Sequence, residues 1–251
     1  MNRLFQFGRR DSAPRGPRGK RAYVIGDVHG CLEQLDRLLG LIEQELRERP
    51  RAKTSIIFVG DLIDRGPDSR GVVERLRTYR HDRIRAHCLA GNHEEVLLRL
   101  LAGERGILTS WLQFGGAECL KSYGCDPAEL AGRSESSGLQ LVKQAIPQSH
   151  SAFIGGFSDT LTFGDYLFVH AGIRPGVDLS LQSQSDLRWI RSPFLDDETD
   201  HGMVVVHGHT INPEIVERPN RIGIDTGAYR TNVLTALALE GEARWVLNTL
   251  E

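Results

Sequence analysis

Three glycine-containing strings decide the fold of this chain: Gly26-Asp27-Val28-His29-Gly30, Gly60-Asp61-Leu62-Ile63-Asp64-Arg65-Gly66 and Gly91-Asn92-His93-Glu94. Each string follows a short aliphatic run that is typical of a buried strand. The intervening segments are long enough for a crossover helix, and this alternation predicts a parallel sheet. In open α/β sheets the loops after such strands face one crevice, so we expect their polar residues to lie close together.

The polar residues of these strings supply part of a ligand shell for two cations. They are Asp27, His29, Asp61 and Asn92. Carboxylate and amide oxygens mixed with neutral imidazole suit manganese, iron or zinc. Two later aliphatic runs also end in histidine, at His170 and at His207-Gly208-His209. Taken singly, each residue has an ordinary interpretation as a turn, cap or core residue. Only the complete set is specific.

In this order, the strings resemble the motifs of calcineurin-like metallophosphoesterases, and within that group the bacterial and phage lambda-phosphatase-like members of the phosphoprotein phosphatase family. The resemblance extends from about Tyr23 to about Leu239. It implies an α/β fold in which a two-sheet β-sandwich is flanked by helices. It also implies two divalent metal ions, with manganese the first candidate and iron or zinc as alternatives.

The same resemblance implies the metal ligands. They are Asp27 and His29 for the first metal, Asp61 as the bridge, and Asn92, His170 and His209 for the second metal. His207 competes with His209 for the last position. We favour His209 because a glycine precedes it, and we expect His207 to support the site from the end of its strand.

The resemblance implies hydrolysis by direct attack of a metal-bridging hydroxide on phosphorus. Two cations lower the pKa of a shared water toward neutrality, so a covalent phosphoenzyme is not required. His93 resembles the general acid of the family, and Asp64 resembles the carboxylate that orients it. The alternative for Asp64 is a cap of the helix that follows Gly66.

Phosphate oxygens favour arginine because its planar guanidinium donates two parallel hydrogen bonds. Arg65 follows Asp64 in its loop and is the first candidate. Arg191 is the second, because Trp189 stands two residues before it, as in the corresponding block of the family. Arg188 competes with Arg191 for this role.

The loop sequences favour a serine/threonine protein phosphatase that acts on a phosphorylated protein or peptide. Asp64-Arg65-Gly66 resembles the protein-phosphatase branch more than the symmetrical dinucleoside tetraphosphatases. A tetraphosphatase or another small-molecule phosphoesterase is the alternative. A pseudo-phosphatase that binds phosphoproteins without hydrolysis is the third hypothesis, and a missing ligand would favour it, but none is missing.

Composition narrows the class of protein. With 251 residues and 40% hydrophobic content, residues 22–251 are sufficient for a single domain with a sizeable core. A net charge of -2 offers no broad basic surface for nucleic acid or membrane. The four cysteines form neither a metal-binding pair nor a secreted framework, and no apolar run has transmembrane length. We therefore expect a cytoplasmic enzyme.

Three parts of the chain lie outside these motifs. Residues 1–21 are rich in arginine without helical or strand periodicity, which predicts a mobile basic tail. Residues from about 108 to 152 are expected to form a mostly helical cap at the mouth of the site. The last third is expected to build the second sheet. Its predicted strands are 160–163, 166–169, 203–206, 221–224, 233–239 and 243–247.

Overall fold

The first sheet contains the strands that precede the three diagnostic strings. A computed structural model describes residues 13–130 and 132–250. The strands of this sheet are β1 (Lys20–Ile25), β2 (Lys53–Phe58), β3 (Ile84–Cys88), β9 (Thr235–Glu240) and β10 (Ala243–Asn248). Their order is β10-β9-β1-β2-β3. The strands β1, β2 and β3 are parallel, while β9 pairs antiparallel with β1 and with β10. The predicted parallel sheet is thus confirmed.

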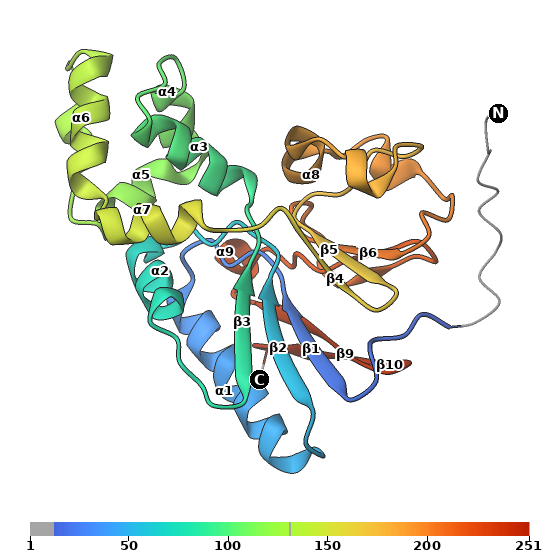
Figure 1. The fold of residues 1–251 in the computed structure, drawn as a ribbon. Helices are drawn as coiled ribbons and strands as arrows, with labels where there is room; N and C mark the ends of the chain where they lie inside the picture. Colours follow the sequence, from blue (N-terminus) through green and yellow to red (C-terminus); the bar gives the residue numbers. More distant parts are fainter. Residues whose placement is uncertain (1–12, 131, 251) are drawn as a thin grey trace.

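The second sheet lies against the first (Figure 1). Its strands are β4 (Thr160–Phe163), β5 (Tyr166–Val169), β6 (Val204–His207), β7 (Val216–Glu217) and β8 (Arg221–Gly223), in the order β4-β5-β6-β8-β7. The strands β4 and β5 form the predicted hairpin, and β5, β6 and β8 run parallel. The carboxyl ends of β5 and β6 therefore join those of β1, β2 and β3 in presenting polar residues.

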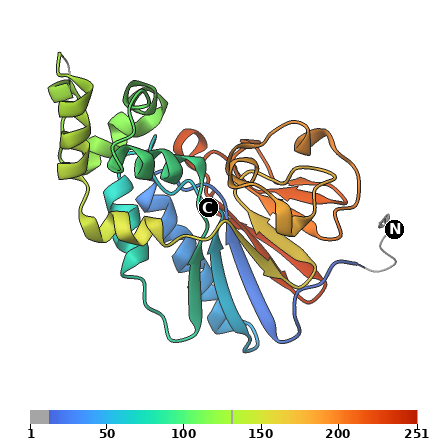
Figure 2. The same ribbon diagram turned by 45° about the horizontal axis from the view of Figure 1, so that its top comes forward.

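Helices cover both outer faces of the sandwich (Figure 1). They are α1 (Leu32–Glu48), α2 (Ser69–Arg77), α3 (Asn92–Leu101), α4 (Leu108–Trp111), α5 (Ala117–Ser122), α6 (Glu135–Ala145), α7 (Gln148–Gly155), α8 (Gln184–Trp189) and α9 (Ala228–Thr231). A π-helical turn, Leu112–Gly116, joins α4 to α5. Both ribbon views place α4 to α7 together at one end of the molecule (Figure 2).

Side-chain alternation along the strands divides the core into layers. Tyr23 and Ile25 of β1 pack with α1, while Val24 packs between the sheets with Phe168 of β5. On the outer face of the second sheet, Val169 packs with residues of α8. The predicted fold class, a two-sheet sandwich flanked by helices, is confirmed.

The expected assignment of the last two strands to the second sheet is wrong. The β9–β10 hairpin belongs to the first sheet, where Ala238 of β9 pairs with Tyr23 of β1. Nearly every residue of β9 is apolar and buried, as in a central strand that is covered on both faces. Sequence order alone does not reveal which sheet such a strand enters.

The structure also differs from the expected tail. Residues 1–12 lie outside the described residues, but the main chain from residue 13 onward is bonded to the body of the protein. The N–H of Arg15 donates to Asp165, and that of Gly16 to Gly241. Arg21 is fully buried in β1 and pairs with Glu240 at 2.8 Å. Arg21, which was expected to lie in the tail, is therefore the second residue of a strand that begins at Lys20.

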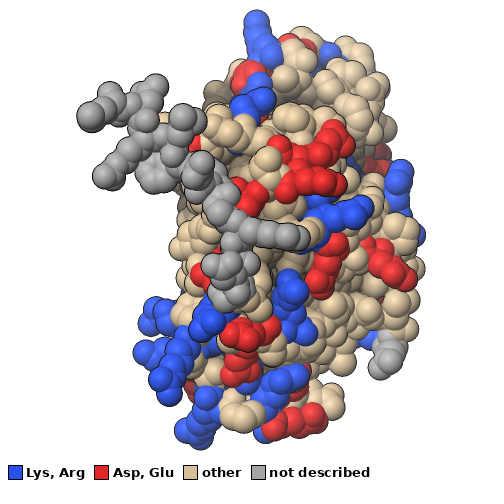
Figure 3. Space-filling view, turned by 90° about the vertical axis from the view of Figure 1, so that its right-hand side faces the viewer, with Lys and Arg blue, Asp and Glu red and all other residues tan. Residues whose placement is uncertain are grey.

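Two surface properties bear on the class of protein. Within the described ranges, no helix combines the length and the apolarity that a membrane crossing needs. On the face shown in Figure 3, Lys and Arg side chains are interspersed with Asp and Glu. Because charges of both signs are mixed, this face has no extended region of purely positive or purely negative electrostatic potential.

Candidate metal centre and active site

The polar loops at the strand ends have an unusual backbone. Six non-glycine residues in the described part of the chain have positive φ, and five of these lie in the loops after β1, β2 and β6. The five are His29, Asp61, Asp64, Arg65 and His209. This left-handed conformation costs roughly 1–2 kcal/mol per residue, so the surrounding structure must hold it in place. Such strain typically marks a functional site.

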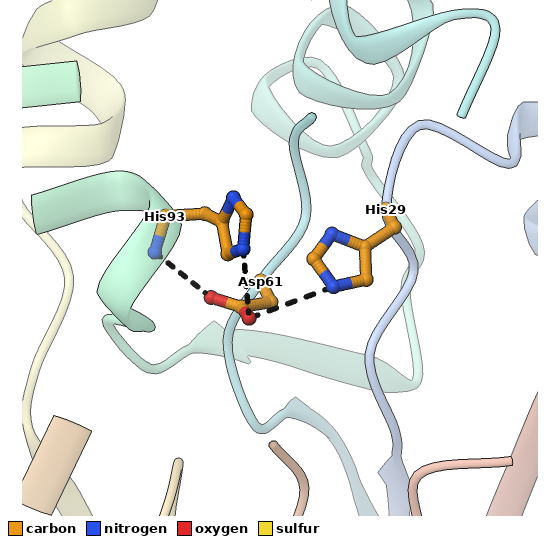
Figure 4. A group of neighbouring side chains, drawn as sticks. All are labelled: His29, Asp61 and His93. Atoms are coloured by element: carbon orange, nitrogen blue, oxygen red, sulfur yellow. Dashed lines mark hydrogen bonds and ion pairs between the residues drawn. The ribbon is translucent and has the colours of Figure 1, made fainter. Parts of the chain in front are cut away.

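Asp61 lies at the centre of these loops. Its Oδ2 atom is 3.5 Å from His29 Nε2, 3.4 Å from His170 Nε2 and 3.9 Å from His93 Nε2. Figure 4 shows His29 and His93 on opposite sides of the carboxylate. Burial alone would raise the pKa of Asp61, but the facing imidazoles outweigh it and hold this pKa well below its usual range. Asp61 is therefore a buried anion.

The side chains form two groups around this carboxylate. The ligand atoms of each group lie within 4.8 Å of one another; the groups are His29, Asp61 and His93, and Asp61, His170 and His209. Asn92 joins the second group, because its Oδ1 atom is 3.0 Å from His170 Nε2. Asp27 adjoins it by accepting the backbone N–H of His209 at 3.1 Å. Five of the six predicted ligands thus fall into the two groups, with His93 beside His29 and Asp61, whereas Asp27 lies next to the second group and outside both.

The tautomers of two histidines test whether cations fit these groups. Main-chain carbonyls lie at Nδ1 of both rings, Ile63 O at 2.8 Å from His29 and Val59 O at 2.9 Å from His170. Each ring can donate its Nδ1–H to that carbonyl, which leaves Nε2, the atom that faces Asp61, available as a metal ligand. Asp61 raises the pKa of His170, and a cation bound at Nε2 would take the place of the proton that this carboxylate favours.

Two further observations fit the same conclusion. The Nε2 atom of His209 is buried without a hydrogen-bond partner, and burial lowers the pKa of this ring to about 2, so it stays neutral. Burial, Asp225 and Asp61 raise the pKa of Asp27 well above its usual range, which reflects uncompensated negative charge. Imidazole nitrogens and crowded carboxylates form a donor set that divalent cations satisfy.

Gly208 allows the close approach of two strand ends. A Cβ atom at this position would lie 2.0 Å from Asp27 Oδ1. Only glycine leaves room for the carboxylate to accept the N–H of the next residue, His209. This is a physical reason for the glycine that precedes the predicted histidine ligand.

Asp64 and His93 form a buried pair beside these groups. Asp64 Oδ2 lies 2.7 Å from His93 Nδ1 and 2.9 Å from Trp111 Nε1. Burial would lower the pKa of His93, but Asp61 and the bond from Asp64 reverse this and raise it. The alternative role of Asp64 as a helix cap does not apply, because Asp68 caps α2 by accepting the N–H of Gly71.

The arginines differ in how free they are. Arg65 donates to His29 Nε2 at 3.0 Å, and Arg191 approaches the carbonyl of His209 at 3.5 Å. Both line a cavity of about 430 Å³. Arg188 instead pairs with two carboxylates: it lies 3.3 Å from Glu95, and its Nε donates to Asp159 at 2.7 Å. Arg188 therefore has less guanidinium surface to offer a phosphate.

The cavity extends from the buried groups to the helices of segment 108–155. It is lined by Arg65, Asn92, His93, Val96, Arg99, Ile107, Ser110, Trp111, Phe114, Trp189, Arg191 and His209. One wall is α3, another is α4 with the turn that follows it, and α8 closes the third side. The lining combines cationic and aromatic side chains, and no carboxylate is among these residues.

His207 lies outside the two groups of ligand atoms, whereas Tyr229 lies beside one of them. His207 is buried against Phe194, and its Nδ1 atom lies 3.0 Å from the carbonyl of Gly208. It belongs to neither group of ligand atoms. The ring of Tyr229 lies 5.3 Å from that of His29 and under the guanidinium of Arg65. Tyr229 is thus next to the site.

Sequence reasoning assigned no role to Glu94, which joins two of the loops. Its carboxylate accepts the backbone N–H groups of Asp61 and Leu62 at 2.8 Å, of Ile63 at 3.3 Å and of Gly91 at 2.9 Å. The spacing of three residues from Gly91 is that of a capping box, and this signal could have identified it. Glu94 holds the loop of Asp61 against the start of α3.

The comparisons with known proteins agree with this geometry. The family model "Calcineurin-like phosphoesterase" matches residues 20–242. The chain belongs to the calcineurin-like phosphoesterase family. Among its relatives, the serine/threonine-protein phosphatase 1 of Salmonella typhimurium strain LT2 is 38% identical to this phosphoesterase over 229 residues, which are 88% of this chain and 93% of that protein.

Other similar proteins differ in what they act on. The asymmetrical bis(5'-nucleosyl)-tetraphosphatase PrpE of Oceanobacillus iheyensis is 27% identical over 233 residues, which are 85% of this phosphoesterase and 86% of that enzyme. A solved structure of a cold-active protein tyrosine phosphatase superposes with a TM-score of 0.56 and 16% identity, over 93% of this chain and 81% of that one. This likeness shows the shared fold alone.

Proposed function

We propose that this phosphoesterase is a metal-dependent serine/threonine protein phosphatase. The observation that carries the proposal is the buried Asp64–His93 pair, 2.7 Å apart, beside Asp61. The alkoxide of phosphoserine or phosphothreonine is a poor leaving group, so it needs a proton as the P–O bond breaks. The relation to the Salmonella phosphatase over nearly its whole length supports the same substrate class.

The proposed ligands are those that converge in the structure. Asp27 and His29 would hold one cation, Asn92, His170 and His209 the other, and Asp61 both. Divalent cations bound there, manganese first and iron or zinc as alternatives, would supply Lewis-acid activation of water and phosphate. His93 is close enough to be a ligand, but we assign it to proton donation because Asp61 and Asp64 raise its pKa and so favour a proton on the ring, whereas the pKa values of His29 and His209 are lowered.

In this assignment the chain's own residues orient the phosphate and move the proton. Arg65 and Arg191 line the cavity and would bind the phosphate oxygens, which places the ester oxygen toward His93. His93 Nε2–H donates its proton to that oxygen, and Asp64 stabilises the ring while it is charged.

We also propose that residues 22–251 form one phosphoesterase domain in which segment 108–152 is a cap. The four cysteines are free thiols, which suits an enzyme of the reducing cytoplasm.

A dinucleoside tetraphosphatase is the second candidate. The specific observation in its favour is the 27% identity with the tetraphosphatase PrpE over most of both chains. The cavity also has aromatic residues, Trp189 and Phe114, beside its arginines, and a nucleobase would stack on such rings.

One experiment separates the two candidates. Metal-stripped enzyme is assayed with and without added manganese on a phosphothreonine peptide, by phosphate release, and on diadenosine tetraphosphate, by the nucleotides formed. We expect manganese-dependent turnover of the peptide. Preference for the dinucleotide would replace the proposal by the second candidate, and inactivity on both substrates would favour a phosphoprotein-binding pseudo-phosphatase.

A further inference from the structure

We propose that Trp111 is a positioning residue that acts through Asp64 on His93. It would couple the helical segment 108–155 to protonation of the leaving group. The inference rests on the proposed function, because it takes His93 as the proton donor.

The contact is a direct hydrogen bond between buried groups. Asp64 Oδ2 accepts from Trp111 Nε1 at 2.9 Å and from His93 Nδ1 at 2.7 Å. Asp64 is fully buried and Trp111 is 3% exposed, so water does not replace either donor. Two donors on one oxygen fix the direction of the carboxylate, and this direction sets the orientation of the imidazole.

The backbone beside Trp111 holds the same loop. The carbonyl of Gly115 accepts the N–H of Arg65 at 3.0 Å, and a Cβ atom at Gly115 would lie 2.5 Å from that nitrogen. A Cβ atom at Gly116 would lie 2.3 Å from the indole ring of Trp111. The indole of Trp111, the turn 112–116 and the loop of Asp64 and Arg65 are therefore in tight contact. A shift of the turn would move Asp64.

The loop itself depends on such external bonds. Asp64 and Arg65 have φ values of 69° and 67°, a conformation that is unfavourable for both residues. The N–H of Asp64 donates to Ser69 Oγ at 2.9 Å, and that of Arg65 donates to Gly115. Of these two hydrogen bonds, the one to Gly115 comes from segment 108–155, which lies outside the strand-end loops.

Another tryptophan provides the matched control. The Nε1 atom of Trp245 in β10 is buried without a hydrogen-bond partner, and its ring packs against Tyr23 and Arg49. A tryptophan that only packs is thus present in the same protein. Replacement by phenylalanine removes an indole N–H at either position, but only Trp111 donates to the Asp64–His93 pair.

The experiment compares two leaving groups in the manganese-loaded, full-length enzyme. We expect Trp111→Phe to lower kcat on a phosphoserine peptide about tenfold. On p-nitrophenyl phosphate the loss should stay below about twofold, because nitrophenolate leaves without a proton. KM and metal content should not change. His93→Asn serves as the reference and should show the same selectivity with a larger loss, while Trp245→Phe should show none.

A spectroscopic readout accompanies the kinetics. In the zinc-loaded protein, the His93 Nδ1 proton is identified in the low-field proton NMR spectrum by its absence from His93→Asn. Its signal should shift in Trp111→Phe and stay in place in Trp245→Phe. If Trp111→Phe fails to fold, benzothienylalanine at position 111 removes the N–H and preserves the shape of the ring.

The outcomes separate this inference from the proposed function. Equal losses on both substrates in the Trp111 variants, or no loss, would overturn the inference while the selectivity of His93→Asn upholds the proton donor. If His93→Asn itself lacks selectivity, the assignment of His93 fails and the inference fails with it.

Discussion

The strand-end loops and the helical segment 108–155 contribute to the same cavity in different ways. In the loops the chemically active side chains are almost fully buried, and hydrogen bonds hold strained backbone in place. In the segment, Phe114 is 67% exposed although it lines the cavity. The difference indicates that the sheets fix the reacting groups, whereas the segment shapes what surrounds the substrate. Trp111 is the point where the two regions meet.

The largest effect should come from the loops. We expect Asp61→Asn to lose cations and to lower kcat/KM about 10³-fold or more, because both groups of ligand atoms share this carboxylate. Metal analysis of the purified variant and phosphatase assays measure the two effects. Retention of both metals with high activity would remove Asp61 from the centre of the site.

An intermediate effect should come from Arg191, which follows α8 and lines the cavity next to the His209 loop. Arg191→Ala should raise KM and lower kcat, together about tenfold to 100-fold in kcat/KM, with metal content unchanged. Arg188→Ala is the matched control, because its guanidinium is already paired with Asp159 and Glu95. Loss of metal from Arg191→Ala, or a greater loss of activity in Arg188→Ala, would contradict the assignment.

The smallest effect should come from the exposed wall of the cavity. Phe114→Ala should raise KM for a phosphopeptide about threefold and leave turnover of p-nitrophenyl phosphate unchanged, because only the longer substrate reaches this ring. Leu181→Ala provides the control, since Leu181 is 74% exposed but does not line the cavity. An equal effect on both substrates would show that the wall also acts on the reacting groups.

The place of these polar residues in the fold could be predicted because their signal is local in the sequence. A polar residue directly after a buried strand falls at the carboxyl edge of the sheet, whatever the rest of the chain does. This rule places Asp27, Asp61 and His170 in one crevice, as the structure does. It also required no knowledge of which strands are neighbours.

Other features depend on contacts that no local pattern reveals. The partner of β9 is β1, more than 200 residues earlier, so its sheet could not be deduced from chain order. Residues 13–19 resemble a tail in composition, and hydrogen bonds to loops far away in the sequence hold them in place. Trp111 has the spacing of a core residue, and only its position in space shows that its N–H faces Asp64.

The central place of β1 has a consequence for the synthesis of this protein. Its neighbour β9 ends at Glu240, and Asp27 bonds to His209, 182 residues farther along the chain. Chains emerge from the ribosome with the N-terminus first. The edge of β1 that pairs with β9 therefore stays open until residues 235–240 have been translated, and the site stays incomplete until His209 has emerged.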